Sequence, residues 1–167
     1  MPSPLKIRSA VPEDAAGIVA VFTVIVAERI HSAIESAWTV EQQRRYLESL
    51  SGRGAIHIAV DESGEIVGLQ SIDLWPSTLT SMAHVGQVGT FILPAWRTRG
   101  VGRQLWDVTL PFARGAGYRK LVIQVRASNT TAQAFYQRLG FADCGRLKRQ
   151  VIFDGVEDDE VLMELFL

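Results

Sequence analysis

The chain has 167 residues, of which 47% are hydrophobic and 21% are charged, and its formal net charge is −1. This length and balance predict one folded domain, 1–167, and they exclude both a disordered chain and a broadly basic coat for nucleic acid. A single cysteine, Cys144, excludes an internal disulfide and a cysteine-rich metal site, so we expect an idle thiol and no metal. The apolar run Gly17–Ala27 is too short to span a bilayer, and nothing before it resembles a secretory signal. We therefore expect a cytoplasmic protein that binds neither nucleic acid nor membranes.

The first part of the chain predicts a strand followed by two helices. Leu5–Ala10 is typical of a short strand. A helix opens with proline and acidic residues at Pro12–Asp14 and should run to about Ile30. The spacing of Thr39–Gln42 is that of a capping box, which predicts a second helix to about Leu50.

Three polar side chains, Glu28, His31 and Glu35, cluster around the end of the first helix. Charged residues at a helix end are usually solvated, so a surface role is one interpretation. The other is that they bind a substrate. The residues alone leave both open.

Next comes a hairpin and then a central strand. Ala55–Val60 alternates between apolar and other residues, and Ile66–Leu74 returns after a turn at Asp61–Gly64. Further on, the apolar run Val88–Leu93 predicts a strand. Pro94 ends it, because proline cannot donate to a sheet ladder.

A basic glycine loop, Arg97–Gly102, follows the central strand, and the next apolar residues have helical spacing. The first turn of a helix exposes unpaired N–H groups and the positive end of the helix dipole. Gly100 and Gly102 would let a ligand approach the backbone, because neither has a Cβ. A phosphate or diphosphate is the expected guest. The alternative is an ordinary strand–helix connection with solvated arginines.

The last third predicts a helix, a strand, a helix and a strand pair. Pro111 should kink or shorten the helix that starts near Gly100. After a short strand, Leu121–Val125, a helix should start at Asn129 and stop at Gly140. The remaining segments predict a final strand pair, Arg146–Phe153 and Val161–Leu167, joined by Asp154-Gly155 and the acidic run Glu157–Glu160. This order predicts a mixed α/β fold on one central sheet.

Two stretches together carry a family resemblance. The first, Ile-Leu-Pro and then Arg-x-x-Gly-x-Gly over 92–102, resembles the acyl-CoA cradle of the GNAT superfamily of N-acetyltransferases. The second, Asn-x-x-Ala-x-x-Phe-Tyr-x-x-Leu-Gly-Phe over 129–141, is similar to the second signature of that superfamily. The order of elements fits over essentially the whole chain. The resemblance implies the GNAT fold, a mixed and mostly antiparallel sheet flanked by about four helices.

The resemblance also implies a site for acetyl-CoA, with no metal. The pantetheine arm would pair with the end of the central strand, the diphosphate would sit on the helix N–H groups, and a backbone N–H near Ile92 would polarise the thioester carbonyl. Asn129 would bind the pantetheine arm, although it also suits a helix N-cap. The implied cofactor-binding residues are Ile92, Leu93, Arg97, Thr98, Arg99, Gly100, Val101, Gly102, Arg103, Asn129 and Tyr136.

Two residues are candidates for acid–base chemistry. Tyr136 matches the family position for the acid that protonates the departing thiolate, and a phenol of ordinary pKa, about 10, is protonated at neutral pH. Without the resemblance, Tyr136 would be a core aromatic residue. Some relatives place a glutamate on the central strand as the base, and this strand has none. His84 acting through water is one candidate, and Glu28 and Glu35 are rivals.

The resulting hypothesis is an N-acetyltransferase that moves an acetyl group from acetyl-CoA to a primary amine of a small molecule. Direct attack in a ternary complex is expected, because no activated nucleophile is visible. Two rivals remain: a protein N-terminal or lysine acetyltransferase, and a non-catalytic acyl-CoA sensor. Sheet edges near the carboxyl end make a homodimer a further expectation.

Overall fold

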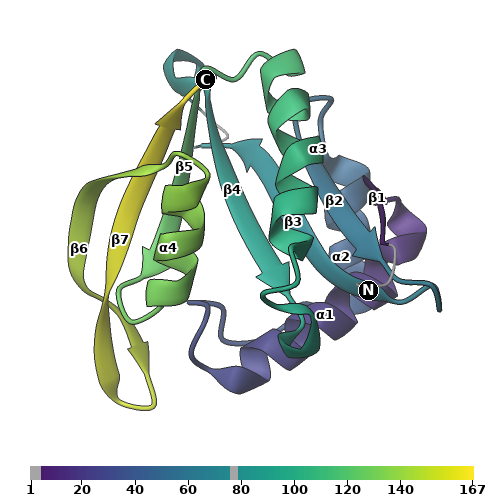
Figure 1. The fold of residues 1–167 in the computed structure, drawn as a ribbon, viewed down its shortest axis with the longest axis horizontal. Coiled ribbons are helices and arrows are strands. Elements are labelled where there is room, and N and C mark those ends of the chain that lie inside the picture. Colours follow the sequence, from purple (N-terminus) through teal and green to yellow (C-terminus); the bar gives the residue numbers. More distant parts are fainter. Residues whose placement is uncertain (1–4, 76–78) are drawn as a thin grey trace.

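The structure is a computed structural model that describes residues 5–75 and 79–167. The strands of this part form one sheet in the order β1-β2-β3-β4-β5-β7-β6 (Figure 1). Only β4 and β5 are parallel; the other neighbouring pairs are antiparallel. The mixed, mostly antiparallel sheet predicted from the sequence is confirmed. The strands are β1 (Lys6–Ser9), β2 (Ala55–Val60), β3 (Ile66–Leu74), β4 (Val85–Ile92), β5 (Lys120–Arg126), β6 (Ala142–Phe153) and β7 (Val156–Phe166).

Helices cover both faces of the sheet. α1 (Ala15–Glu28) and α2 (Val40–Ser49) pack apolar residues against one face, where Ile18, Ile25 and Leu47 meet Ile58 and Leu69. α3 (Val101–Gly115) and α4 (Thr130–Arg138) cover the opposite face, which is the near face in Figure 1. The hydrophobic core on each face lies between the sheet and the helices that cover that face.

The predicted capping box starts α2. Thr39 Oγ1 accepts a hydrogen bond from the N–H of Gln42 at 3.2 Å, and Gln42 Oε1 accepts one from the N–H of Thr39 at 2.9 Å. The first helix ends slightly earlier than predicted, at Glu28, because Arg29 takes a left-handed backbone conformation with φ 57°.

The central strands separate at one end of the sheet. β4 pairs with β5 only from Val85 to Gln87, whereas its pairing with β3 continues to Ile92. Beyond Gln87 the edge of β4 that faces β5 therefore has no strand partner in the part of the chain that the structure describes. Figure 1 shows β4 and β5 diverging toward the amino-terminal end of α3, with α4 beside β5. This separation positions the site described below.

Of the two effects predicted for Pro111, a kink or an early break, the early break does not occur, since α3 continues to Gly115. Proline removes the hydrogen bond to the carbonyl of Asp107, one turn earlier. Pro111 and Asp107 both lie on the exposed face of α3, so water can reach that carbonyl. Buried Leu105, Trp106 and Ala113 hold the opposite face of the helix against the core.

The final strand pair is longer than predicted. The acidic run Glu157–Glu160 lies within β7, and only Asp154-Gly155 forms the turn, with both residues at positive φ. Three arginines compensate this acidic run, because Arg126 pairs with Asp158, Arg146 with Asp159 and Arg149 with Glu157. With cationic partners for three of its four carboxylates, the segment extends as a strand.

Candidate functional site

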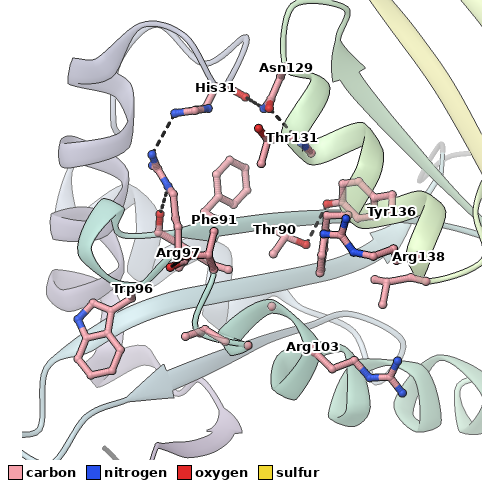
Figure 2. Close-up of a pocket in the computed structure, with 18 of the residues that line it drawn as sticks. His31, Thr90, Phe91, Trp96, Arg97, Arg103, Asn129, Thr131, Tyr136 and Arg138 are labelled. Atoms are coloured by element: carbon pink, nitrogen blue, oxygen red, sulfur yellow. Dashed lines mark hydrogen bonds between the residues drawn. The ribbon is translucent and has the colours of Figure 1, made fainter. Parts of the chain in front are cut away.

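A first pocket of about 500 Å³ opens where β4 separates from β5, between the amino-terminal ends of α3 and α4 (Figure 2). Its wall is mainly apolar, with polar groups at the loop before α3 and at α4. The lining residues are Ile25, His31, Thr90, Phe91, Ile92, Trp96, Arg97, Thr98, Gly100, Val101, Gly102, Arg103, Asn129, Thr131, Ala132, Phe135, Tyr136, Arg138 and Leu139.

The amino end of α3 faces this pocket without a side-chain cap. Gly100 is the N-cap residue, with φ 80°, and no side chain in 5–75 or 79–167 bonds to the first-turn N–H groups. The positive φ suits glycine, which has no Cβ to strain there. No atom lies within 4 Å of the place where a Cβ on Gly100 would stand. Val101, Gly102 and Arg103 thus present N–H groups and the positive end of the helix dipole to the pocket.

The free edge of β4 supplies one further N–H group. Leu93 donates its N–H to the carbonyl of Val67 on β3 at 3.0 Å. Because N–H groups alternate between the two edges of a strand, the N–H of Ile92 points to the unpaired edge beside the pocket. The carbonyl of Ile92 accepts a hydrogen bond from Arg97 Nε at 3.0 Å. The structure therefore leaves the N–H of Ile92 without a partner among the described residues, while Leu93 is bonded within the chain and does not line the pocket.

Arg97 is joined to the end of α1. Its guanidinium donates two hydrogen bonds to Glu28, at 2.8 and 2.5 Å. It donates a third to His31 Nε2 at 3.0 Å (Figure 2). The bond from Arg97 holds the pKa of Glu28 below its usual range. Burial and then the charge of Arg97 lower the pKa of His31. Arg97 therefore anchors α1 to β4, and its charge is already paired.

The remaining predicted loop residues differ in where they point. Thr98 and Arg103 line the pocket, and Arg103 also pairs with the exposed Asp107. Arg99 lies outside the lining, with its guanidinium 5.6 Å from the ring centroid of Trp96. Glu35 is exposed and lines neither pocket described in this section, so the structure does not bring it together with Glu28 and His31.

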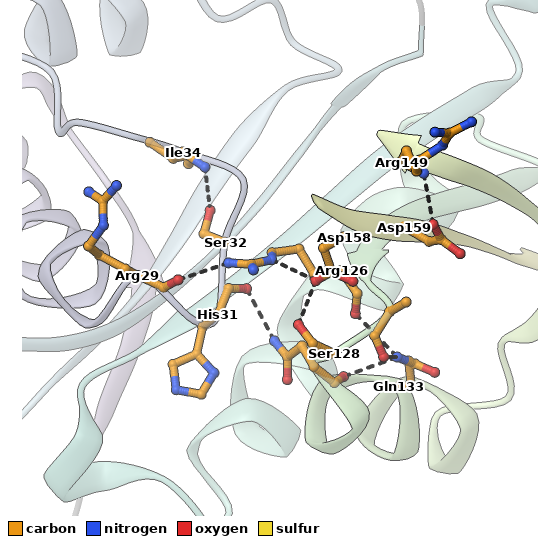
Figure 3. A network of polar contacts seen from close by, with 12 residues as sticks. Arg29, His31, Ser32, Ile34, Arg126, Ser128, Gln133, Arg149, Asp158 and Asp159 are labelled. Carbon is orange, nitrogen blue, oxygen red and sulfur yellow. Dashed lines mark hydrogen bonds and ion pairs between the residues drawn. The ribbon is translucent and has the colours of Figure 1, made fainter. Parts of the chain in front are cut away.

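Asn129 caps α4 and holds the segment after α1. Its Oδ1 accepts a hydrogen bond from the N–H of Ala132, and its Nδ2 donates one to the carbonyl of His31, each at 3.1 Å. Arg126 holds the same segment by donating to the carbonyl of Arg29 at 2.9 Å, and it pairs with Asp158 at 3.0 Å (Figure 3). The wall of the pocket near His31 is thus tied to β5, β7 and α4.

The hydroxyl of Tyr136 is held in a buried polar row. It donates to Thr90 Oγ1 at 2.9 Å, and Gln70 Nε2 donates to the same oxygen at 2.8 Å. Burial raises the pKa of Tyr136 to about 12. The phenol at this wall of the pocket is therefore protonated at neutral pH, and its direction is set by Thr90 of β4.

Gly102 has a packing role that the sequence did not reveal. A Cβ at this position would stand 2.9 Å from Phe135 Cζ and 3.3 Å from Ile92 Cδ1. Gly102 is buried, so its lack of a side chain lets α3 and α4 meet beneath the pocket. The close approach is to Phe135, whereas the sequence suggested an approach by a ligand.

His84 is remote from the other predicted residues. It precedes β4, at the end opposite the pocket, and Thr90 lies about 20 Å farther along at about 3.3 Å per strand residue. It lines neither pocket, and its carbonyl accepts hydrogen bonds from Arg119 and Lys120. The geometry does not bring His84 together with Tyr136.

A second pocket of about 340 Å³ lies on the face covered by α1 and α2, and it includes Gln87, Val88 and Gly89 of β4. Phe91 lines both pockets, so the two meet along this strand. The lining residues are Phe22, Ile34, Ser36, Ala37, Trp38, Gln43, Tyr46, Ile56, Leu69, Ser71, Asp73, Gln87, Val88, Gly89 and Phe91.

Comparison with known proteins identifies the family of this chain. The model of the acetyltransferase (GNAT) family matches residues 24–141. This span includes the loop before α3 and the whole of α4. The chain belongs to the GNAT family. The resemblance stated from residues 92–102 and 129–141 is confirmed.

Relatives of this GNAT chain include enzymes with named small acceptors. It is 23% identical over 143 residues to the L-methionine sulfoximine/L-methionine sulfone acetyltransferase of Pseudomonas aeruginosa, which covers 85% of this chain and 83% of the relative. A GNAT acetyltransferase structure from Streptococcus pneumoniae has a TM-score of 0.89 at 26% identity, covering 98% of this chain and 100% of the other.

A third likeness concerns the fold alone. A phosphinothricin acetyltransferase from Sinorhizobium meliloti has a TM-score of 0.89 at 19% identity, over 98% of this chain and 88% of the other, and its structure was solved in complex with acetyl-CoA.

Sequence reasoning missed the second pocket and part of the first. The polar Gln70, Ser71 and Asp73 stand among the apolar residues of β3, and this was a visible signal. Gln43 gave no signal, because a buried glutamine on a polar helix cannot be told from an exposed one. Within 5–75 and 79–167, no helix is long and apolar enough to cross a membrane, and no group of three metal-ligating side chains is assembled.

Proposed function

We propose that this GNAT protein transfers the acetyl group of acetyl-CoA to a primary amine of a small molecule, by direct attack in a ternary complex. One observation carries the proposal: the uncapped amino end of α3 opens onto a pocket that continues along the free edge of β4. Such an end binds anions through its N–H groups. A strand edge with a free N–H binds an extended chain such as pantetheine.

The residues around the first pocket divide the work of holding acetyl-CoA. Val101, Gly102 and Arg103 would bind the diphosphate through their N–H groups, with Thr98 beside them. Ile92 would donate its N–H toward the thioester region. The side-chain amide of Asn129 has two N–H groups, and one of them donates to the carbonyl of His31. The other is suited to bind the pantetheine arm. We assign Arg97 to anchoring the pocket wall, because Glu28 already occupies its guanidinium.

Tyr136 is the proposed general acid. Collapse of the tetrahedral adduct breaks the C–S bond, and the departing thiolate takes a proton from the phenol. The raised pKa of Tyr136 supports this role, because the group holds its proton over the whole neutral range. Cys144 is exposed on β6 with a raised pKa, so it does not offer a thiolate for a covalent intermediate.

The second pocket is the proposed acceptor site. It meets the first pocket at Phe91, and side chains of α1, α2 and the segment between them wall it on the side away from the sheet. Walls on both sides favour a small molecule over an extended protein segment. The named small acceptor of the Pseudomonas aeruginosa relative agrees with this choice.

Two measurements test the proposed function. Saturating acetyl-CoA should raise the melting temperature, whereas NAD and ATP should not, and free thiol should be released when a small amine is added. No shift with acetyl-CoA would contradict the cradle assignment. A shift without thiol release from any amine or peptide would indicate a sensor. Thiol release with peptides alone would indicate a protein acetyltransferase.

A further inference from the structure

The second pocket has an electrostatic character that the named relatives do not predict. Its wall is mostly apolar and aromatic, with Phe22, Trp38, Tyr46 and Phe91 among its side chains. Asp73 is the one charged residue among the described residues that line it, and these include no lysine, arginine or histidine. An anionic group entering the pocket would therefore meet a negative charge and no positive one.

The carboxylate of Asp73 is held by neutral donors. Oδ1 accepts the N–H of Leu74 at 2.8 Å, and Oδ2 accepts the hydroxyl of Tyr46 at 3.3 Å. Among the described residues, no arginine or lysine forms an ion pair with Asp73. Its charge is left to act on whatever enters the pocket.

A second, independent feature of the same wall points to a ligand. Gln43 is 2% exposed, and within the described chain its Nε2 has no hydrogen-bond partner. A buried amide N–H without a partner is unfavourable, so native chains rarely keep one. Because Gln43 lines the pocket, a ligand oxygen is the natural acceptor for this group.

Trp38 completes a surface suited to a cation. Its ring is half exposed and meets the ring of Tyr46 edge-on, with centroids 5.5 Å apart. Both rings line the pocket together with Asp73. Aromatic faces and a carboxylate both attract an ammonium group, and both are unfavourable surroundings for a carboxylate.

We propose that the acceptor is an amine with an apolar or aromatic skeleton that carries no acidic group. Asp73 would attract its ammonium form, and Gln43 would donate to a neutral oxygen of the molecule, such as a hydroxyl. This inference rests on the proposed acetyltransferase function. It predicts a different acceptor from that named for the Pseudomonas aeruginosa relative, methionine sulfoximine. Methionine sulfoximine is an amino acid, and its carboxylate would face Asp73 in this pocket.

The transfer balances with this class of acceptor. The ammonium loses one proton to water and attacks as the neutral amine. The new C–N bond replaces the C–S bond, and coenzyme A leaves as the thiol with the proton from Tyr136. The nitrogen gives up a second proton, which returns to Tyr136 through water and restores the phenol. The products are an N-acetylamine, free coenzyme A and one net proton, and no oxidant or further co-substrate is required.

Matched pairs of amines that differ by one carboxylate test the proposal. We would measure thiol release with wild-type protein for 2-phenylethylamine against phenylalanine and for tyramine against tyrosine, with methionine sulfoximine alongside. The acceptor without the carboxylate should have at least tenfold higher kcat/KM in each pair. Equal or higher kcat/KM for the amino acids would overturn the inference while leaving the proposed function in place. Absence of release from every amine would overturn both.

Variants of the two polar residues locate the effect. Asp73→Asn should reduce the preference within each pair by several-fold, and the matched control Glu62→Gln, on an exposed turn, should leave it unchanged. Gln43→Leu should lower kcat/KM for tyramine more than for 2-phenylethylamine, because only tyramine offers an oxygen to the amide. An unchanged preference in Asp73→Asn would contradict the role of this carboxylate. The wild-type ratios decide the main proposal even if a variant fails to fold.

Discussion

Tyr136 is a buried residue that packs in the core and also presents a hydroxyl group to the pocket. Its ring packs against Phe135 and Phe141, with centroids 5.1 and 5.5 Å away, while its hydroxyl lies at the pocket wall and bonds to Thr90. The packing fixes the ring, and Thr90 fixes the direction of the hydroxyl. A merely structural tyrosine would need only the ring, so the hydroxyl is the group to test.

Tyr136→Phe keeps the ring and removes the proposed acid. We expect kcat to fall by about 10²–10³-fold, in the range of general acid catalysis, with the affinity for acetyl-CoA changed little. Thr90→Val, which keeps the phenol and removes its partner, should lower kcat less and shift the pH profile. Steady-state kinetics across pH 6–10 with thermal melts would check both. An unchanged kcat in Tyr136→Phe would remove the acid role.

Glu160 gives the molecule a pH dependence of stability. It is 9% exposed, accepts a hydrogen bond from Gln124 Nε2 at 3.2 Å, and burial raises its pKa. The folded chain thus holds this proton more tightly than the unfolded chain. The contribution of this group to the stability of the fold is fully present below the pKa of the unfolded chain, about 4.3. It is lost as the pH rises through the higher pKa of the folded chain.

Glu160→Gln should therefore raise the melting temperature at pH 7–8 and change it little near pH 4. The amide keeps an oxygen for Gln124 and carries no charge to bury. The exposed Glu157→Gln serves as the control and should change stability little at either pH. Equal melting of wild type and Glu160→Gln at neutral pH would contradict a net cost of burying this carboxylate.

At the scale of elements, the contact between α3 and α4 fixes the width of the first pocket. Gly102 of α3 faces Phe135 of α4 so closely that a Cβ would meet the ring at 2.9 Å. Gly102→Ala should lower the free energy of unfolding by about 1–3 kcal/mol through overpacking. Gly115→Ala, on the same helix with open space around it, is the control and should cost nothing. Phe135→Leu should relieve the loss, as urea unfolding of the double variant would show.

The ion pair between Glu28 and Arg97 ties α1 to the end of β4. Both side chains are about a quarter exposed and the contact is bidentate. A double-mutant cycle with Glu28→Ala and Arg97→Ala should give a coupling of about 1–2 kcal/mol, above the usual surface pair because of the partial burial. The exposed pair Glu41–Arg45 should give about 0.5 kcal/mol or less. Equal couplings would mean that Arg97 does not anchor the wall.

The fold was largely predictable because local signals and the two signatures agreed. The Thr39–Gln42 capping box and the glycine at residue 100 act within one turn of chain, and the structure confirms the helix starts that they indicate. Pro111 alone could not decide between a kink and an early break, because its effect depends on which face of α3 it occupies. Which face of the helix is exposed is decided by tertiary packing.

The site was predictable only in part. The order of residues 97–103 indicated an anion-binding helix end, but it could not show that Glu28, far away in the sequence, occupies Arg97. It also could not show that Gly102 faces Phe135. The second pocket is assembled from α1, α2, β3 and β4, so no single stretch of sequence contains it.

At the scale of the whole molecule, one opening in the sheet organises the two pockets. The first lies where β4 leaves β5 and faces α3 and α4, and the second lies on the α1–α2 side of the same strand. A donor in one and an acceptor in the other would meet near Thr90 and Phe91. The separation of β4 from β5 is thus the feature on which a ternary complex depends.

A crystal structure with bound coenzyme A tests the central claim most directly. We predict diphosphate oxygens within hydrogen-bond distance of the N–H groups of Val101, Gly102 and Arg103, with the pantetheine arm along the free edge of β4. A bound coenzyme A whose diphosphate lies elsewhere, with the amino end of α3 left unoccupied, would contradict the account.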